Sequence, residues 1–134
     1  MKLSSKGRYA VRIMSELGRC QGEYVSVAQL SEKQGITVKY LEKIISMLNR
    51  AGLIESSRGS MGGYKLVKSP KEYSIAEILR VTDDLPKLAP CIASGEHCPR
   101  VNECDSIGCW EKLSALITNY LSTVTLEDVI TKKY

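Results

Sequence analysis

The sequence has no phenylalanine, one tryptophan and one histidine, and it contains no long apolar run. A transmembrane helix needs roughly 18 or more apolar residues in a row, so no membrane-spanning segment is expected. Residues 1–6 lack the apolar stretch of a secretory signal, which predicts a cytoplasmic protein. Aromatic residues make up only 6% of the chain, too few for a protein that binds single-stranded nucleic acid by base stacking.

The single histidine, His97, has no acid–base partner that the sequence reveals, and the chain carries no nucleotide- or phosphate-binding fingerprint. We therefore do not expect an enzyme. An electron carrier that uses the cysteines stays open, and visible absorption without any effect on DNA binding would favour it.

Charge is distributed unevenly along the 134 residues. Residues 1–80 contain 14 Lys/Arg and 7 Asp/Glu, a net charge of +7, whereas residues 81–134 contain 5 and 8, a net charge of −3. A basic half of this kind suits a polyanion such as double-stranded DNA, although small domains also differ by a few charges without function. We expect a DNA-binding domain over residues 1–80, followed by a cysteine-rich loop and dimerisation helix over residues 81–134.

Three helices are expected in the basic half. Apolar residues recur at helical spacing over residues 5–20, which predicts the first helix. Ser26 and Gln29 have the spacing of a capping box for the second helix. Gly35 suits the tight turn of a helix-turn-helix, and a third helix is expected from Val38 to about Arg50.

A β-hairpin is expected next, because residues 53–57 can pair with residues 64–67 across a turn that contains three glycines. This order of elements predicts a winged helix-turn-helix, a mainly α fold with a small β-wing. A long helix from about Gly108 to Val124 carries an apolar stripe that needs a partner surface. A second copy of the chain is the simplest partner, and a helix folded back on its own domain is the alternative.

In a winged helix-turn-helix the third helix enters the major groove, and the wing reaches the adjacent minor groove. Lys39 and Lys43 are four residues apart and suit phosphate or guanine contacts, while Glu42 can accept a hydrogen bond from cytosine. The expected DNA-binding residues are Ser4, Ser5, Lys6, Lys39, Tyr40, Glu42, Lys43, Ser46, Arg58, Gly59 and Ser60.

Five cysteines are present, and four of them are close together in the sequence. Cys20 stands alone in a helical pattern and is expected to be a small buried apolar residue. The others are Cys91, Cys98, Cys104 and Cys109, separated by six, five and four residues. A cytosolic chain does not keep such a group as structural disulfides. The intervals differ from the paired cysteines of structural zinc and suit an iron–sulfur cluster, with a loosely spaced zinc site or a thiol redox switch as alternatives.

Four motifs carry a family resemblance: residues 2–10, Tyr40-Leu41-Glu42, residues 58–64, and the cysteine loop followed by Trp110. On these motifs the sequence resembles the Rrf2 family of bacterial repressors from Met1 to about Ile130. The cysteines match the branch of that family that binds an iron–sulfur cluster.

The resemblance implies a homodimer of winged-helix domains with an iron–sulfur cluster, in particular 2Fe–2S. The cluster ligands that it implies are Cys91, Cys98 and Cys104. In that branch a histidine three residues after the third cysteine is the fourth ligand, but here Ile107 occupies this position and cannot coordinate a metal. Cys109 is the first candidate for the fourth ligand, and His97 is the second.

The resemblance further implies a sequence-specific transcription regulator, mainly a repressor, that senses cluster or redox status. Genes for cluster assembly or cysteine metabolism are the expected targets, and a cluster-delivery or cysteine-synthesis protein is a candidate partner. The alternative is a cluster-free repressor of sulfur metabolism that acts through a partner enzyme or through thiol oxidation.

Overall fold

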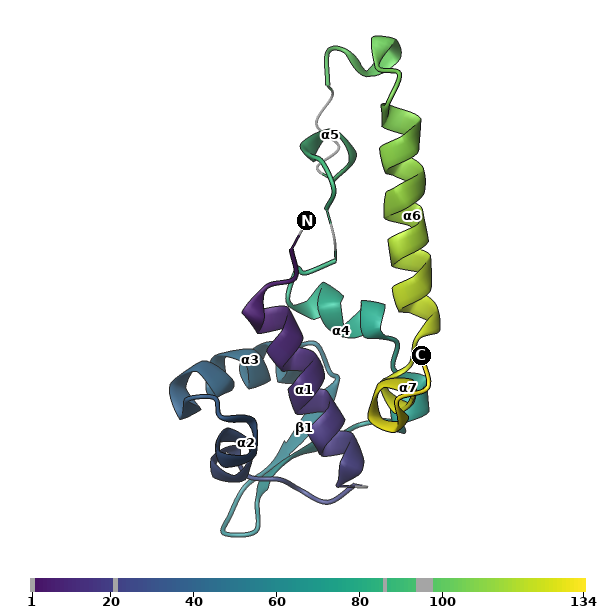
Figure 1. Cartoon of the computed structure of the whole chain (residues 1–134). Coiled ribbons are helices and arrows are strands. Elements are labelled where there is room, and N and C mark those ends of the chain that lie inside the picture. The colour runs from purple at the N-terminus through teal and green to yellow at the C-terminus, as the bar shows by residue number, and fades with distance from the viewer. Residues whose placement is uncertain (1, 21, 86, 94–97) are drawn as a thin grey trace.

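The protein is described here from a computed structural model that covers residues 2–20, 22–85, 87–93 and 98–134. A helical body occupies one end, and helix α6 extends away from it (Figure 1). In chain order the elements are α1 (Ser5–Arg19), α2 (Val27–Gln34), α3 (Val38–Arg50), β1 (Ile54–Ser57), β2 (Gly63–Leu66), η1 (Pro70–Glu72), α4 (Ile75–Val81), α5 (Pro90–Ala93), η2 (Val101–Glu103), α6 (Ile107–Thr123) and α7 (Leu126–Thr131). The predicted fold, mainly α with a small β-wing, is confirmed. Within the described ranges, no helix is both long and apolar enough to cross a membrane.

Side-chain caps explain where the three N-terminal helices begin. The Ser4 hydroxyl accepts a hydrogen bond from the Gly7 amide at the start of α1. Ser26 and Gln29 form the expected capping box of α2, and the Thr37 hydroxyl caps α3. These bonds satisfy amide groups that have no partner within a helix, so the sequence itself specifies the helix-turn-helix.

One apolar core joins the two halves of the chain. Helix α3 buries the predicted face of Leu41, Ile44, Ile45 and Leu48, and α1 packs on α2, α3, α4 and β2. Helix α7 returns to pack on α1, where Leu126 is fully buried. The division of the chain at residues 80 and 81 remains a prediction.

The wing is a two-stranded antiparallel ribbon in which Ile54 pairs with Leu66 and Ser57 pairs with Gly63. Strand β1 begins one residue later than expected, at Ile54, and β2 is shifted one residue toward the turn, to Gly63–Leu66. Gly63 has a φ of 152°, and a Cβ there would lie 2.3 Å from the Val25 carbonyl oxygen. Only glycine fits at this position, where the segment before α2 bridges to the wing.

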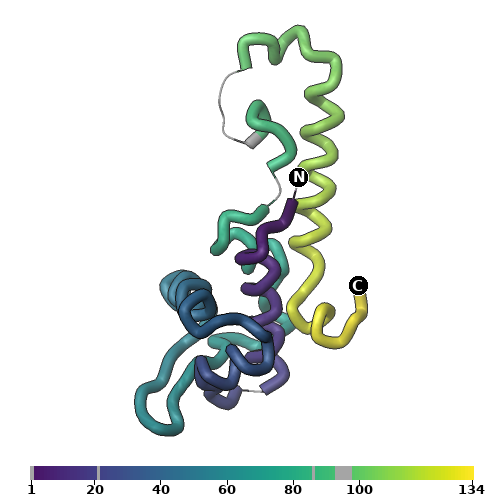
Figure 2. The backbone as a smooth tube through the Cα atoms, turned by 60° about the vertical axis from the view of Figure 1, so that its left-hand side comes forward, coloured from purple at the N-terminus to yellow at the C-terminus, as the bar shows by residue number. Residues whose placement is uncertain are grey.

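The C-terminal half differs from expectation in two places. The part of residues 81–134 before the long helix is expected to be a cysteine-rich loop, but within it Pro90–Ala93 form the short helix α5. Helix α6 packs on α4 only through its lower part, where Leu121 and Val124 contact the core. Figures 1 and 2 show the rest of α6 projecting beside α5, away from the helical body.

Candidate DNA-binding surface and cysteine segment

The exposed face of α3 carries most of the residues expected to contact DNA. Lys39, Glu42, Lys43 and Ser46 are all exposed, because the opposite face of the helix is buried in the core. A depression of about 390 Å³ at the start of α3 is lined by Thr37, Tyr40 and the two lysines. The fold therefore presents two cations, a carboxylate and hydroxyl groups on one helical face, a combination that suits the groove of a duplex.

Tyr40 also joins α3 to α1. Its ring packs edge-on against Tyr9, with 5.9 Å between ring centres, and its hydroxyl lies 3.5 Å from the Ser5 hydroxyl. Because Tyr40 is half-buried, it fixes the start of the recognition helix against the first turn of α1.

The three residues expected to contact DNA at the start of α1 differ in their freedom to do so. The Ser4 amide donates to one Asp84 carboxylate oxygen at 3.1 Å, and the Ser4 hydroxyl donates to the other at 2.7 Å. Both donors of Ser4 are therefore used within the protein. Ser5 is exposed and Lys6 is half-buried, so these two carry the expectation of phosphate contacts.

A further contact positions the helix-turn-helix and was not expected from the sequence. The Arg12 guanidinium donates to the side-chain oxygen of Gln34 at 3.0 Å and to its backbone carbonyl at 2.8 Å. The same guanidinium lies over the Tyr9 ring. Arg12 thereby ties α1 to the last residue of α2, but its place on the exposed face of α1 gives no sign of this partner.

The wing tip is basic and exposed. Arg58, Gly59 and Ser60 are all accessible, and the neighbouring Met61 is 89% exposed. Behind the tip, the Lys65 ammonium pairs with Glu55 at 3.2 Å and lies over the Tyr24 ring. Lys65 therefore stiffens the ribbon, whereas Arg58 has no ion pair among those in the described part of the chain.

The four clustered cysteines lie beyond α4, on the segment that leads into α6. We call the described residues 87–93 and 98–109 the cysteine segment. Cys91 in α5 and Cys98 are half-buried, Cys104 and Cys109 are exposed, and all four are free thiols. His97, the second candidate for the fourth ligand, lies outside the described residues.

Cys104 has the most clearly perturbed thiol. Its sulfur lies 3.4 Å from the Ser106 hydroxyl. Hydrogen bonding from the Ser106 side chain, followed by that from the Ser106 backbone, lowers the pKa of the Cys104 thiol. A larger share of thiolate near neutral pH suits a metal ligand or a reactive thiol.

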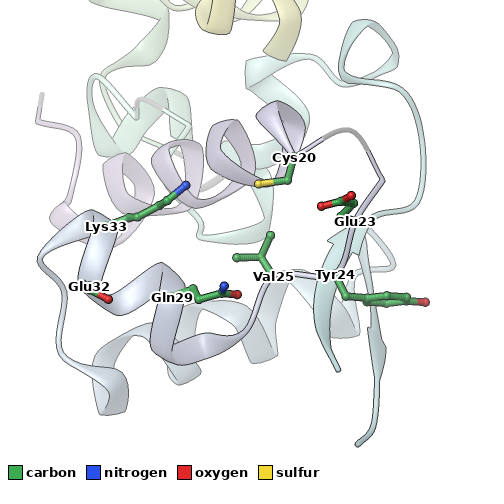
Figure 3. Close-up of a pocket in the computed structure, with 7 residues that line it drawn as sticks. All are labelled: Cys20, Glu23, Tyr24, Val25, Gln29, Glu32 and Lys33. Carbon is green, nitrogen blue, oxygen red and sulfur yellow. The ribbon is translucent and has the colours of Figure 1, made fainter. Parts of the chain in front are cut away.

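A separate pocket of about 410 Å³ lies between the end of α1 and α2 (Figure 3). Cys20 lines it together with Glu23, Glu32 and Lys33. Cys20, expected to be a small buried apolar residue, packs against the edge of the core but is only half-buried there. The Lys33 ammonium pairs with the Glu16 carboxylate at 2.5 Å. Lys33 therefore has a structural role, because this ion pair joins α2 to α1.

Comparison with known proteins supplies the family. The sequence profile of the Rrf2 family, described as an iron-dependent transcriptional regulator, matches residues 3–132. The chain belongs to the Rrf2 family. The resemblance drawn from its motifs is thereby confirmed, and with it the assignment as a transcription regulator that binds DNA.

Individual Rrf2 relatives agree with this assignment. The HTH-type transcriptional regulator IscR of Photorhabdus laumondii is 38% identical over 131 residues, which cover 97% of this chain and 79% of that protein. The IscR of Pectobacterium carotovorum is 37% identical, with 99% and 81% covered.

Solved structures of Rrf2 proteins share the fold. CymR, the global cysteine regulator of B. subtilis, superposes with a TM-score of 0.79 at 30% identity, covering 100% of this chain and 99% of that one. The IscR of T. potens superposes with a TM-score of 0.77 at 32% identity, covering 100% and 89%.

The chemistry of the cysteine segment fits the iron–sulfur cluster that the family resemblance implies, because it offers four free thiols. In the single chain, however, the cysteine side chains of this segment lie apart. Among the described residues, no three Cys, His, Asp or Glu side chains are close enough to hold one metal ion. The thiols of this Rrf2 protein would therefore have to approach one another to act as a single set of ligands.

Proposed function

We propose that this Rrf2 protein is a homodimeric repressor whose operator affinity depends on an iron–sulfur cluster held by Cys91, Cys98, Cys104 and Cys109. The observation that carries the proposal is the position of four free thiols on one segment, apart from the DNA-binding face (Figure 1). When bound, a cluster would report on iron, oxygen or sulfur status through its assembly and loss. The target genes would be those of cluster assembly or cysteine metabolism.

The DNA-binding step is performed by α3 and the wing. Lys39 and Lys43 contact phosphates or guanine in the major groove, and Glu42 accepts from a cytosine amino group. Arg58, Gly59 and Ser60 approach the adjacent minor groove, where a narrow A·T tract concentrates negative potential. In a dimer, two such readers face half-sites about one helical turn apart.

The exposed apolar face of α6 supports the dimer. Trp110, Leu113, Leu116 and Tyr120 are between 38% and 58% exposed, although they recur at helical spacing. An exposed stripe of this kind along a projecting helix suits a twofold contact with a second copy.

Replacing Leu113 and Leu116 together with glutamate is expected to convert the dimer into a monomer, because two carboxylates would be buried at the contact. Light scattering after size exclusion should show a mass near the 14.9 kDa of one chain instead of about twice that mass. Ser122→Glu is the control, since Ser122 is exposed and the helical repeat places it on the side of α6 away from Leu113 and Leu116. A double variant that remains dimeric would rule out this face as the interface.

The cluster is tested by purification without oxygen, followed by iron and sulfide analysis, an absorption spectrum and operator binding. Wild-type protein should contain iron and sulfide and absorb in the visible region. Cys104→Ala and Cys109→Ala should lose most of both, whereas Cys20→Ala should retain them. If Cys109→Ala retains the full cluster, the fourth ligand is another residue; if the wild type binds no iron, the cluster proposal fails.

A cluster-free repressor of sulfur metabolism is the second candidate. It is favoured by the separation of the cysteines in the described chain and by the likeness to CymR, a global cysteine regulator in B. subtilis. This candidate predicts a colourless protein that binds its operator fully when prepared without oxygen. Its affinity would instead respond to thiol oxidation or to an added cysteine-synthesis enzyme.

A further inference from the structure

Asp84 lies where the DNA-binding domain ends and the chain turns toward the cysteine segment. Helix α4 is closed by a hydrogen bond from the Asp84 amide to the Leu79 carbonyl at 2.9 Å. Between them Asp83 adopts a left-handed conformation, with a φ of 55°, that non-glycine residues seldom take. This turn directs the chain away from α4 and points the Asp84 side chain at α1.

The Asp84 carboxylate is docked closely on the first turn of α1. Its two oxygens accept from the amide and the hydroxyl of Ser4. A Cβ on Gly7 would lie 2.6 Å from one of these oxygens and 2.9 Å from the Asp84 Cβ. Glycine at position 7 is therefore what lets the carboxylate approach the helix, and Ser4 and Gly7 together form a fitted seat for it.

The electrostatics of this contact favour the ionised carboxylate. Burial alone would raise the pKa of Asp84, but hydrogen bonds from Ser4 and Thr82, with the charge of Lys6, lower it overall. A negative charge also suits the amino end of a helix. The contact is thus formed near neutral pH without any further partner.

The seat of Asp84 is connected to the recognition helix by the next residue of α1. The Ser5 hydroxyl lies 3.5 Å from the Tyr40 hydroxyl, and Tyr40 packs on Tyr9 of the same helix. The first turn of α1 therefore contacts Asp84 on one side and α3 on the other. It also carries Ser5 and Lys6, which are expected to contact phosphates.

Both ends of the cysteine segment are connected along the chain to α4 or to a helix that packs on it. One end begins at residue 87, three positions after Asp84, and leads to Cys91. The other continues into α6, which carries Cys109 and packs on α4. Asp84 therefore stands on the shorter of the two covalent routes from the cysteines to α4, because the other route runs along α6 from Cys109 to Leu121.

We propose that Asp84 is a positioning residue that couples the cysteine segment to the DNA-binding surface, by holding the first turn of α1 against α3. This proposal rests on the proposed function, because it requires operator affinity to respond to the cysteine segment. Coupling of this kind needs a measured change in one site when the other is altered.

The test uses full-length, metal-free protein with the Cys20→Ala substitution, so that iodoacetamide alkylates only the other cysteines. Operator Kd is measured for the reduced and the alkylated forms by fluorescence anisotropy, and the ratio of the two is the readout. We expect the operator Kd of the reduced and alkylated forms to differ by about tenfold in the Cys20→Ala protein. After Asp84→Asn in the same protein, the two Kd values should differ by less than twofold. Asp83→Asn is the matched control, because it removes the same charge and an exposed ion pair with Lys87 at 3.1 Å but leaves the hydrogen bonds between Asp84 and Ser4, so it should retain the tenfold ratio.

A second variant separates position from charge and from loss of fold. Asp84→Glu keeps the charge but lengthens a side chain that already contacts Gly7, so it too should reduce the ratio below twofold. Thermal denaturation of each variant establishes that the measured protein is folded. If Asp84→Asn and Asp84→Glu keep the tenfold ratio, Asp84 does not couple the two parts. If reduced and alkylated Cys20→Ala protein have the same operator Kd, the coupling inference fails, while the proposed function is decided separately by the iron and sulfide analysis.

Discussion

Replacing Tyr73 with phenylalanine is expected to lower the free energy of unfolding by about 2–3 kcal/mol, because the change leaves the Lys68 amide without a partner and the Val67 amide and Leu53 carbonyl with only their long bond of 3.5 Å to each other. The Tyr73 side chain is fully buried. Its hydroxyl donates to the Leu53 carbonyl at 2.7 Å and accepts from the amides of Val67 and Lys68 at 3.0 and 2.9 Å. Burial raises the pKa of Tyr73, so the phenol keeps the proton that it donates.

These three hydrogen bonds join the two strands at the base of the wing, on the side away from its tip. Leu53 precedes β1, whereas Val67 and Lys68 follow β2. Chemical denaturation should report the loss of stability, and the melting temperature should fall by roughly 5–10 °C. Tyr134→Phe serves as the control, because Tyr134 is 74% exposed. A melting temperature within 2 °C of wild type would mean that water replaces the phenol at the base of the wing.

The parts of this fold that local rules specify could be predicted from the sequence. Ser26 with Gln29 marks the start of α2, and Gly35, with a φ of 64°, ends it. The buried face of α3 follows from the spacing of its apolar residues. These features depend on neighbours within a few positions, and such neighbours are visible in a sequence.

The contacts that position the DNA-binding surface could not be predicted in this way. Ser4 and Asp84 are 80 positions apart, and Tyr73 reaches Leu53 over 20 positions. A serine near a helix start and an aspartate after a helix are common, so neither residue type indicates its distant partner. Only the packed fold brings such pairs together.

The cysteine segment and α6 show a related limit. The spacing of the cysteines indicates which donors are available, but the approach of Cys91 to Cys109 depends on the backbone between them. In α6 the sequence predicts an apolar stripe that needs a partner surface. Which part of the stripe packs on α4 depends on where the helix crosses α4, so Leu121 contacts the core while Trp110 and Tyr120 stay exposed.

Removing both lysines of α3 is expected to produce the largest loss of DNA affinity. Each phosphate contact releases counterions and contributes about 0.9 to the slope of log affinity against log salt concentration. Lys39 and Lys43 are both exposed beside the depression at the start of α3. The double alanine variant should therefore reduce this slope by about 2 and weaken operator binding by roughly 10- to 100-fold near 0.15 M salt.

The matched control removes two positive charges elsewhere, through Lys71→Ala and Lys133→Ala, which change exposed residues in η1 and after α7. If long-range attraction by net charge dominated, the two double variants would lose similar affinity. If local contacts dominate, only the Lys39 and Lys43 variant shows the smaller slope. At this salt concentration the attraction between exposed charges more than about 8–10 Å apart is largely screened. If that variant keeps the wild-type slope of log affinity against log salt concentration, the main phosphate contacts are made by Lys6 and Arg58. Helix α3 would then serve for base recognition alone.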